Sequence, residues 1–184
     1  MSEEADLVVR LKNPKSQNQA FGELVAQYQE RLYWHIRRIV LTHQNADDVL
    51  QETFIKIFRN IDGFKGESKL YSWMYRIATN EALSFLKRNS KIQSISGDEQ
   101  QENQLANLMA DPYFDGDQAA LELQGALLEL PEKQRLVFNM KYFQELKYDE
   151  ISAILETSVG ALKASYHLAV KKIEKHLKKD GLEA

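Results

Sequence analysis

The sequence YDEISAILETSVGALKASYHLAVKK, at residues 148–172, has the clearest helical pattern in the chain. Its apolar residues recur at steps of three and four, the period of a helix that is buried along one face. The pattern predicts a short helix over 148–155 and a longer one over 159–179, separated by a polar turn at 156–158. Ser158 stands where a side chain can cap the longer helix. A short helix, a three-residue turn and a longer basic helix are typical of a helix-turn-helix.

The longer helix has two different faces. Its inward stripe consists of Val159, Leu162, Tyr166, Ala169 or Val170, Ile173 and Leu177. The opposite face carries, at four-residue spacing, Lys163, His167, Lys171 and Lys175. Six lysines and one acidic residue lie between 163 and 179, a density suited to contact with nucleic-acid phosphates. The alternative is a solvated helix face, and the preceding turn and short helix favour nucleic-acid contact over it.

Upstream of this motif the apolar residues also follow a helical period. A leucine-rich helix is predicted from about 118 to 130, and Pro131 fits the first position of the next helix, which runs to about 143. The second half of the chain is therefore expected to be a helical module that ends in the helix-turn-helix.

The N-terminal half predicts a second helical module. A short helix is expected near 5–11 and a long amphipathic one over 20–41. The next helix is expected to begin at Asn45, a good N-cap, with Asp47 and Asp48 in its first turn, where the helix dipole favours anions.

A Gly-punctuated loop at 62–68 follows, and Ser68 can cap a further helix over roughly 69–88. Residues 91–117 lose the periodicity and are rich in Gln, Asn, Asp and Ser, so we expect an acidic, largely unstructured linker. The residues that can dock locally within it are Leu105, Leu108 and Met109.

Composition and charge support an all-α fold. Only 8 Gly and 3 Pro among 184 residues favour long helices over turn-rich sheets. The net charge of −3 argues against a nucleic-acid protein until its distribution is considered. Residues 1–90 hold 13 basic and 11 acidic side chains, 91–118 hold 1 and 6, and 119–184 hold 10 of each. We expect two small helical domains, 1–90 and 118–184, joined by a flexible acidic linker over 91–117.

Several kinds of chemistry are not expected. With no cysteines the chain has no disulfide, thiolate metal site or thiol redox switch. The four histidines lie far apart without paired ligand spacing, so we expect no metal and no cofactor. No apolar run approaches the roughly 18 residues of a membrane span, and the start MSEE lacks the basic segment of a secretory signal. We therefore expect a soluble, cytoplasmic protein.

Aromatic and basic residues alternate in the segment 64–88. They are Phe64, Lys65, Lys69, Tyr71, Trp73, Tyr75, Arg76, Phe85, Lys87 and Arg88, with Asn80 between them. Stacking surfaces beside cations, with an amide that can read a base edge, suit single-stranded or opened nucleic acid. Because aromatics at helical spacing are also common in protein cores, we expect about half of these to be buried.

Acidic and amide side chains gather on one turn of the helix that begins near residue 45, namely Asp47, Asp48, Gln51 and Glu52. Paired carboxylates can perform acid–base or metal chemistry, but no His, Ser or Gly-rich phosphate loop accompanies these. We expect no enzymatic activity. The patch is interpreted as a docking surface for a partner, with plain solvation as the alternative.

Together these segments resemble the extracytoplasmic-function sigma factors of bacterial RNA polymerase. The string DDVLQETF at 47–54 is similar to the family's polymerase-docking motif. FKGES at 64–68 and YSWMYRIATN at 71–80 are similar to its promoter-melting and minus-10 reading segment. LPEKQR at 130–135 and the helix-turn-helix resemble its minus-35 reading domain. The motifs stand in the family's order and at its spacing.

The resemblance implies a transcription initiation factor with three kinds of site. The residues implied to bind the clamp helices of the largest polymerase subunit are Asp47, Asp48, Gln51, Glu52 and Phe54. Those implied at the minus-10 element are Phe64, Lys65, Ser68, Lys69, Tyr71, Arg76, Asn80, Lys87 and Arg88, of which Phe64, Lys65, Ser68, Lys69 and Asn80 frame a pocket for a flipped non-template base. Those implied at the minus-35 element are Lys163, Ala164, His167, Lys171, Lys172 and Lys175.

The implied partners are core RNA polymerase, including the flap of its second-largest subunit, promoter DNA and an anti-sigma factor. The chain departs from the family at Glu145 and Lys147, where Gly and Ser are usual, which weakens the expected turn and cap. Leu168 removes an expected phosphate contact. The alternatives are a helix-turn-helix regulator that acts without polymerase, and a helical adaptor with no role on DNA.

Overall fold

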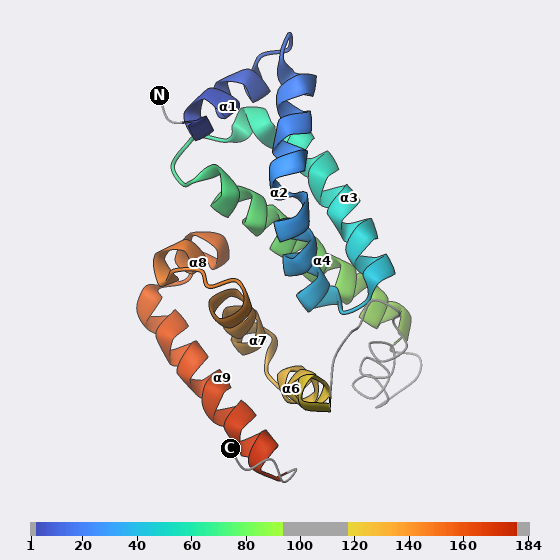
Figure 1. Ribbon diagram of the computed structural model, residues 1–184, viewed down its shortest axis with the longest axis vertical. Coiled ribbons are helices and arrows are strands. Elements are labelled where there is room, and N and C mark those ends of the chain that lie inside the picture. The colour runs from blue at the N-terminus through green and yellow to red at the C-terminus, as the bar shows by residue number, and fades with distance from the viewer. Residues whose placement is uncertain (1–2, 94–117, 180–184) are drawn as a thin grey trace. The chain divides into compact units, whose positions relative to one another are not determined.

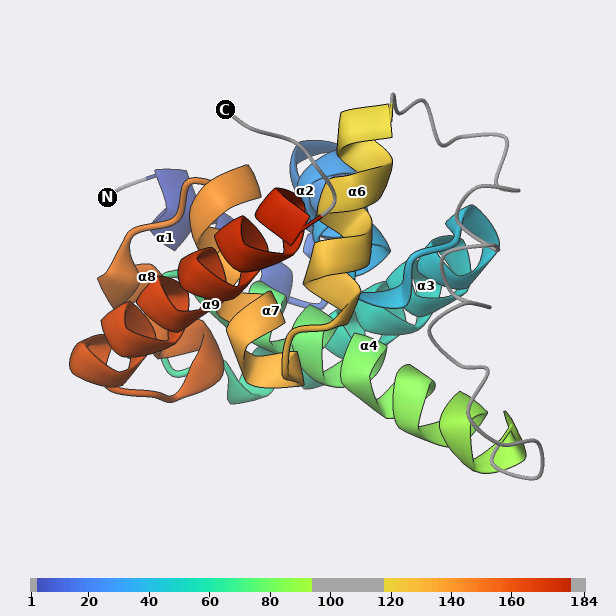
Figure 2. The ribbon, with the colours of Figure 1, turned by 90° about the horizontal axis from the view of Figure 1, so that it is seen from below.

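The computed structural model describes residues 3–93 and 118–179, and every secondary-structure element in these ranges is helical (Figures 1 and 2). In the first part the elements are α1 (Glu3–Lys12), α2 (Gln17–Val40), α3 (His43–Asn60), the 3-10 helix η1 (Ile61–Gly63) and α4 (Leu70–Gln93). In the second they are α6 (Gln118–Leu128), α7 (Glu132–Phe138), the π-helix η2 (Asn139–Phe143), α8 (Tyr148–Leu155) and α9 (Val159–Lys179). The predicted all-α fold is confirmed.

Two compact units are present, one formed by α1, α2, α3 and α4 as far as Lys87, and one that contains α6 to α9. The core of the first unit comes from the apolar stripes of its three long helices. Its buried side chains include Leu24, Leu32 and Ile36 of α2, Val49 and Ile57 of α3, and Met74, Tyr75 and Ala78 of α4. Because full burial of a large apolar side chain stabilises by about 1.5–3 kcal/mol, these stripes hold the three helices together.

Polar contacts between α2 and α4 fix how these two helices lie against each other. The ring nitrogen Nε2 of buried His35 lies 2.8 Å from Oγ1 of Thr79. The hydroxyl of Tyr75 donates to the carbonyl of Arg31 at 3.4 Å, and burial raises the pKa of this tyrosine, which keeps it a neutral donor. Buried polar groups are costly unless paired, so these contacts favour one arrangement of α4 on α2.

The start of α3 differs from the prediction. The helix begins at His43, so Asn45 lies inside its first turn and is not the N-cap. Leu41, with φ of 72°, ends α2 in the left-handed region, and the chain returns to helix after Thr42. The prediction was wrong because the start of α3 is determined by the tight turn between the packed helices α2 and α3. Local N-cap preference alone would have placed this start two residues later, at Asn45.

The start of α4 is also capped differently from the prediction. The Leu70 N–H donates to Oε1 of Glu4, from α1, at 3.0 Å, whereas the Ser68 hydroxyl donates to the Lys69 carbonyl. A carboxylate from another helix therefore takes the role expected of Ser68. The predicted loop before α4 is present beyond η1, and Gly66 adopts a φ of 74°, a conformation in which glycine is unstrained.

Helix α4 continues to Gln93, so the first three residues of the predicted linker are helical. The remainder of that linker, 94–117, lies outside the described residues, as do its three candidate docking side chains. The prediction that it is unstructured stays a prediction.

In the second unit, α8 and α9 have the predicted bounds, and the Ala161 N–H approaches Oγ of Ser158 at 3.4 Å, as expected of a weak cap. Helix α9 packs against α6, α7 and α8 (Figure 2). Its buried stripe confirms the predicted inward face. The members of this core are Ala126, Leu127, Leu130, Phe138, Ala169 and Ile173, with the Tyr166 ring stacked on Phe138 at 5.7 Å.

Two details of the second unit depart from the expected turns. Pro131 occupies the N-cap of α7 and not its first helical position, with an extended ψ of 141°. The turn before α8 forms although the expected Gly is absent, since Glu145 itself adopts a φ of 53°. The Lys147 N–H donates to the carboxylate of Glu150 at 2.9 Å, so α8 is capped from inside the helix.

Candidate nucleic-acid interface

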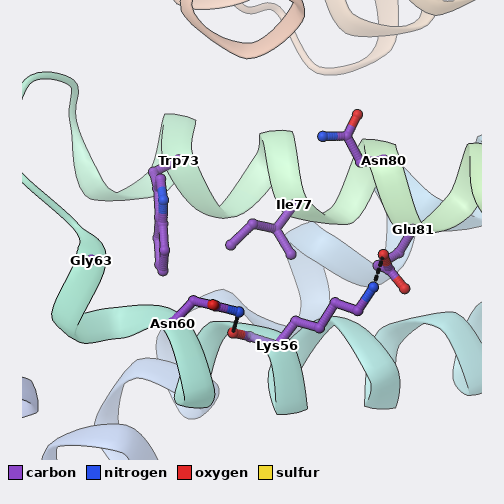
Figure 3. A pocket seen from close by; sticks show the side chains of 7 residues that line it. All are labelled: Lys56, Asn60, Gly63, Trp73, Ile77, Asn80 and Glu81. Atoms are coloured by element: carbon purple, nitrogen blue, oxygen red, sulfur yellow. Dashed lines mark hydrogen bonds and ion pairs between the residues drawn. The ribbon is translucent and has the colours of Figure 1, made fainter.

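A pocket of about 430 Å³ opens between the C-terminal half of α3 and the facing side of α4 (Figure 3). Its lining residues are Lys56, Asn60, Gly63, Trp73, Ile77, Asn80 and Glu81. Helical spacing brings them together, because residues four apart on α3, and four, seven and eight apart on α4, lie on one helix face. In Figure 3, Trp73 and Ile77 reach from α4 toward α3, whereas the amide of Asn80 points away from α3.

The pocket combines an apolar wall with polar groups that can read a ligand. The indole of Trp73 and the side chain of Ile77 form the apolar wall. The Asn60 amide nitrogen donates to the Lys56 carbonyl at 2.8 Å, which holds the Asn60 side chain in place. The exposed Asn80 side chain carries an amide that can both donate and accept. A flat apolar surface beside amides suits a planar heterocycle such as a nucleobase.

An ion pair closes one end of the pocket. The ammonium of Lys56 on α3 binds the carboxylate of Glu81 on α4 (Figure 3). The Glu81 side chain is 9% exposed, whereas that of Lys56 is 47% exposed. Because a buried carboxylate is costly without a partner, the pairing with Glu81 keeps the Lys56 ammonium at this position. The pair therefore supplies a fixed cation beside the apolar wall.

The five residues predicted to frame one pocket lie in different places. Asn80 lines the pocket, but Phe64 is 5% exposed and packs against Trp73, with ring centroids 5.3 Å apart. Ser68 lines a separate cavity against α1, and Lys65 and Lys69 are exposed on the loop. Phe64 is therefore a packing neighbour of the indole and not one of the residues that line the pocket.

The remaining residues predicted at the minus-10 element follow α4. Tyr71 and Arg76 are half-buried, and Lys87 and Arg88 are exposed. The ammonium of Lys69 lies 5.6 Å from the centre of the Tyr71 ring. Of the five aromatics in the segment, Phe64 and Tyr75 are buried and the others are half-buried, close to the expected proportion.

Five of the pocket's lining residues were not among those predicted to be functional, namely Lys56, Asn60, Gly63, Ile77 and Glu81. Trp73 was singled out only as one of several aromatics. The available signal was the four-residue spacing, which places Lys56 and Asn60 on one face of α3, and Trp73, Ile77 and Glu81 on one face of α4.

The acidic patch on α3 is mostly open to solvent. Asp48, Gln51 and Glu52 are exposed and Asp47 is half-buried. Ile55 adds an apolar side chain, 40% exposed, one turn beyond Gln51. Phe54 is half-buried. Its ring packs edge-on against that of Phe21 on α2, with the ring centroids 6.1 Å apart, so Phe54 also contributes to the packing of α3 on α2.

The outer face of α9 presents the predicted cations. The exposed residues of this face are Lys163, Ala164, His167, Lys171, Lys172 and Lys175. Leu168 is 48% exposed among them, an apolar side chain within a charged surface. The arrangement leaves the ammonium groups available to phosphates along the helix.

Tyr148, the first residue of α8, holds the side chain of Lys163. Its ring lies 5.8 Å from the Lys163 ammonium and 5.3 Å from that of Lys141. Burial raises the pKa of Tyr148, and nearby Tyr166 raises it further, so the phenol stays neutral. Cation–π attraction of this kind restrains the first cation of α9 close to the turn.

Comparisons with known proteins match both units. Residues 24–92 match the family "Sigma-70 region 2", and residues 120–173 match the family "Sigma-70, region 4". The chain is 32% identical over 178 residues to the ECF RNA polymerase sigma factor SigW of Bacillus subtilis (strain 168), which covers 92% of this chain and 95% of that protein. It is 29% identical over 183 residues to the ECF RNA polymerase sigma-E factor of Escherichia coli (strain K12), with 95% of each covered.

Solved structures share the fold. CnrH, solved in complex with the cytosolic domain of CnrY, has a TM-score of 0.69 at 20% identity, with 97% of this chain and 99% of that one covered. RpoE of Bartonella quintana, solved with the anti-sigma factor NepR, has a TM-score of 0.65 at 19% identity, with 86% and 96% covered. Within 3–93 and 118–179, none of the helices combines the length and the apolar character that a membrane crossing needs.

Proposed function

Because this chain belongs to the extracytoplasmic-function sigma factors of the sigma-70 family, we propose which of its residues carry out the separate steps of promoter recognition. A sigma factor binds core RNA polymerase and directs it to start transcription at specific promoters, and this is the function of the chain. The matches to both sigma regions leave no basis for a regulator that acts without polymerase, or for an adaptor with no role on DNA.

The proposed site for the minus-10 element is the pocket between α3 and α4. A base of the non-template strand leaves the stack and enters between Trp73 and Asn80, with Lys56 at the far end. The observation that carries this proposal is the pairing of an indole wall with amides and a fixed cation, inside the segment that matches sigma-70 region 2.

The energetics of this step are favourable. Taking one base out of the duplex costs a few kcal/mol, and stacking on an aromatic side chain returns about 1–3 kcal/mol. Hydrogen bonds from Asn80 and Lys56 to the edge of the base supply the remainder and make it depend on the identity of the base. Exposed Lys65, Lys87 and Arg88 are proposed to hold the phosphates of the opened strand.

The other two surfaces are assigned from their charge and exposure. The α3 patch of Asp48, Gln51 and Glu52 is proposed to dock on the clamp helices of the largest polymerase subunit. On α9, Lys163 and His167 are proposed to reach base edges of the minus-35 element, since they are the polar members of the predicted set that lie nearest its N-terminal end. The minus-35 phosphates are assigned to Lys171, Lys172 and Lys175.

The test is a selection with reconstituted holoenzyme on promoter duplexes whose minus-10 element is randomised. Asn80→Ala should flatten the base preference at one position while it leaves neighbouring positions intact. Asn18→Ala, an exposed asparagine of α2, is the matched control. If Asn80→Ala leaves the base preference at every minus-10 position unchanged, the proposed role of the pocket is wrong, whereas the assignment of the chain as a sigma factor still stands.

We also propose that the chain performs no chemical step itself and acts in the cytoplasm, where its polymerase is. Two solved proteins of the same fold are held by partner proteins, one of them named an anti-sigma factor. By analogy this chain is proposed to be inhibited by an anti-sigma partner. Copurification and inhibition of transcription by a candidate partner support this, and activity unaffected by any copurified protein contradicts it.

A further inference from the structure

Helix α1 is joined by hydrogen bonds to both ends of the loop that precedes α4. At one end, the ammonium of Lys12 donates to the carbonyl of Phe64 at 2.5 Å. At the other end, the carboxylate of Glu4 accepts the N–H of Leu70 at 3.0 Å. The two contacts join residues 52 and 66 positions apart in the sequence, so they are tertiary contacts and not local turns.

The α1 helix is itself held firmly on α2. Its side chains Leu7 and Leu11 are buried, at 7% and 1% exposure. The guanidinium of Arg10 pairs with the carboxylate of Glu23 on α2 at 2.7 Å. Hydrogen bonds to Glu23 and to Asp6 raise the pKa of Arg10 above its ordinary value. Because α1 is packed on α2, its hydrogen bonds to Phe64 and Leu70 hold the two ends of the loop in a defined place relative to α2.

The middle of the loop, at 65–67, faces solvent. Between its ends, Lys65, Glu67 and Lys69 are exposed, and Gly66 gives the backbone a left-handed kink. A cavity of about 250 Å³ lies between the loop and α1, lined by residues of both. The hydrogen bonds at its two ends therefore act together with the packing of the buried Phe64 ring in setting where Phe64 lies.

Phe64 connects the loop to the pocket. Its buried ring packs on Trp73 with centroids 5.3 Å apart, and Trp73 forms the pocket's apolar wall. We propose that Lys12 and Glu4 are positioning residues for minus-10 recognition: through Phe64 and the start of α4 they fix the indole that the flipped base stacks on, without touching the DNA. This rests on the proposed role of the pocket.

The test uses full-length protein in holoenzyme, selected on duplexes with a randomised minus-10 element. Lys12→Met removes the donor and keeps the aliphatic chain. We expect the preference at the flipped position to fall about five- to tenfold, with neighbouring positions unchanged, because a hydrogen bond from a charged group is lost. Lys12→Arg, which keeps a donor, should restore most of it. Glu4→Leu, which removes the acceptor, should lower the preference as Lys12→Met does. Glu4→Gln keeps an acceptor and should retain most of the preference, as Lys12→Arg does.

Lys15→Met is the matched control, since this exposed lysine lies just beyond α1. A double variant with Asn80→Ala separates the possible outcomes. If Lys12 acts through the pocket, Lys12→Met has little further effect on base preference once Asn80 is replaced. A role in folding alone would lower the melting temperature and reduce transcription from all library members equally, which overturns the proposal.

Direct contact of Lys12 with DNA phosphate would also overturn it. In that case Lys12→Met would weaken binding uniformly across sequences and reduce the salt dependence of binding by about one charge. If Asn80→Ala changes the preference and Lys12→Met does not, only the positioning role is lost. If neither variant changes it, the role of the pocket is lost as well.

Discussion

Replacing Trp73 by leucine tests the stacking surface of the pocket directly. Stacking of a base on an aromatic ring contributes about 1–3 kcal/mol. Leucine keeps part of the apolar contact, so we expect the lower half of this range, a loss of about 5- to 30-fold in affinity for an opened minus-10 strand.

The same change costs some stability. The Phe64–Trp73 contact, at 5.3 Å and an interplanar angle of 50°, contributes about 0.5–1.5 kcal/mol beyond the area it buries. That is a fraction of the 5–15 kcal/mol typical of a folded domain, so the variant should stay folded at 25 °C. Thermal unfolding followed by circular dichroism checks this before binding is measured.

The assay is fluorescence anisotropy of holoenzyme with a labelled single-stranded minus-10 oligonucleotide, in two versions. One carries the preferred base at the flipped position, and the other is abasic there. Trp73→Leu should weaken binding of the first and leave the second nearly unchanged, because the abasic strand has no base to stack. The chain has 2 tryptophans, and Trp34→Leu, at a ring 45% exposed on α2, is the matched control. An equal loss on both oligonucleotides, or none on either, would refute the stacking role.

Three further results are expected. Glu52→Lys should weaken binding to core polymerase about tenfold or more, because it reverses a charge on the α3 patch. Competition with labelled protein measures this, and Glu30→Lys on α2, also at an exposed glutamate, should have no such effect. Equal effects of the two variants would contradict the docking assignment. Lys171→Ala should weaken binding to minus-35 duplex equally for all sequences and reduce the salt slope by about 1, and a change in base preference would argue instead for base contact. Glu145→Gly should raise the free energy of unfolding by about 0.5–1 kcal/mol by calorimetry, because Glu145 is exposed at a φ of 53° and loses only strain; destabilisation would show that its side chain matters.

Amphipathic periodicity was sufficient to predict most of the helices. The bounds of α8 and α9 followed from it, as did the buried stripe of α9, because each helix of the second unit packs with one face inward. The turn before α8 formed even with Glu145 in place of glycine, which shows that packing of the helices on either side can hold a strained residue.

Caps were predicted less well, since they depend on tertiary contacts. Ser68 is a good cap by type, yet Glu4 caps α4 from 66 residues away. The pocket was only partly predicted for a similar reason: Asn80 was identified, but Lys56 and Asn60 belong to α3 and become its neighbours only when the two helices pack. Sequence periodicity gives the face of each helix, whereas the pairing of faces comes from the fold.

Transcription in vitro tests whether this chain is a sigma factor. The purified chain is combined with core RNA polymerase that lacks any other sigma factor, on genomic DNA fragments, and the 5′ ends of the transcripts are mapped. We expect a stable complex with core polymerase and transcripts that start at discrete sites sharing two sequence elements. We expect none of these starts with core polymerase alone. No complex with core polymerase, and no starts beyond those of core polymerase alone, would contradict the assignment of this chain as a sigma factor.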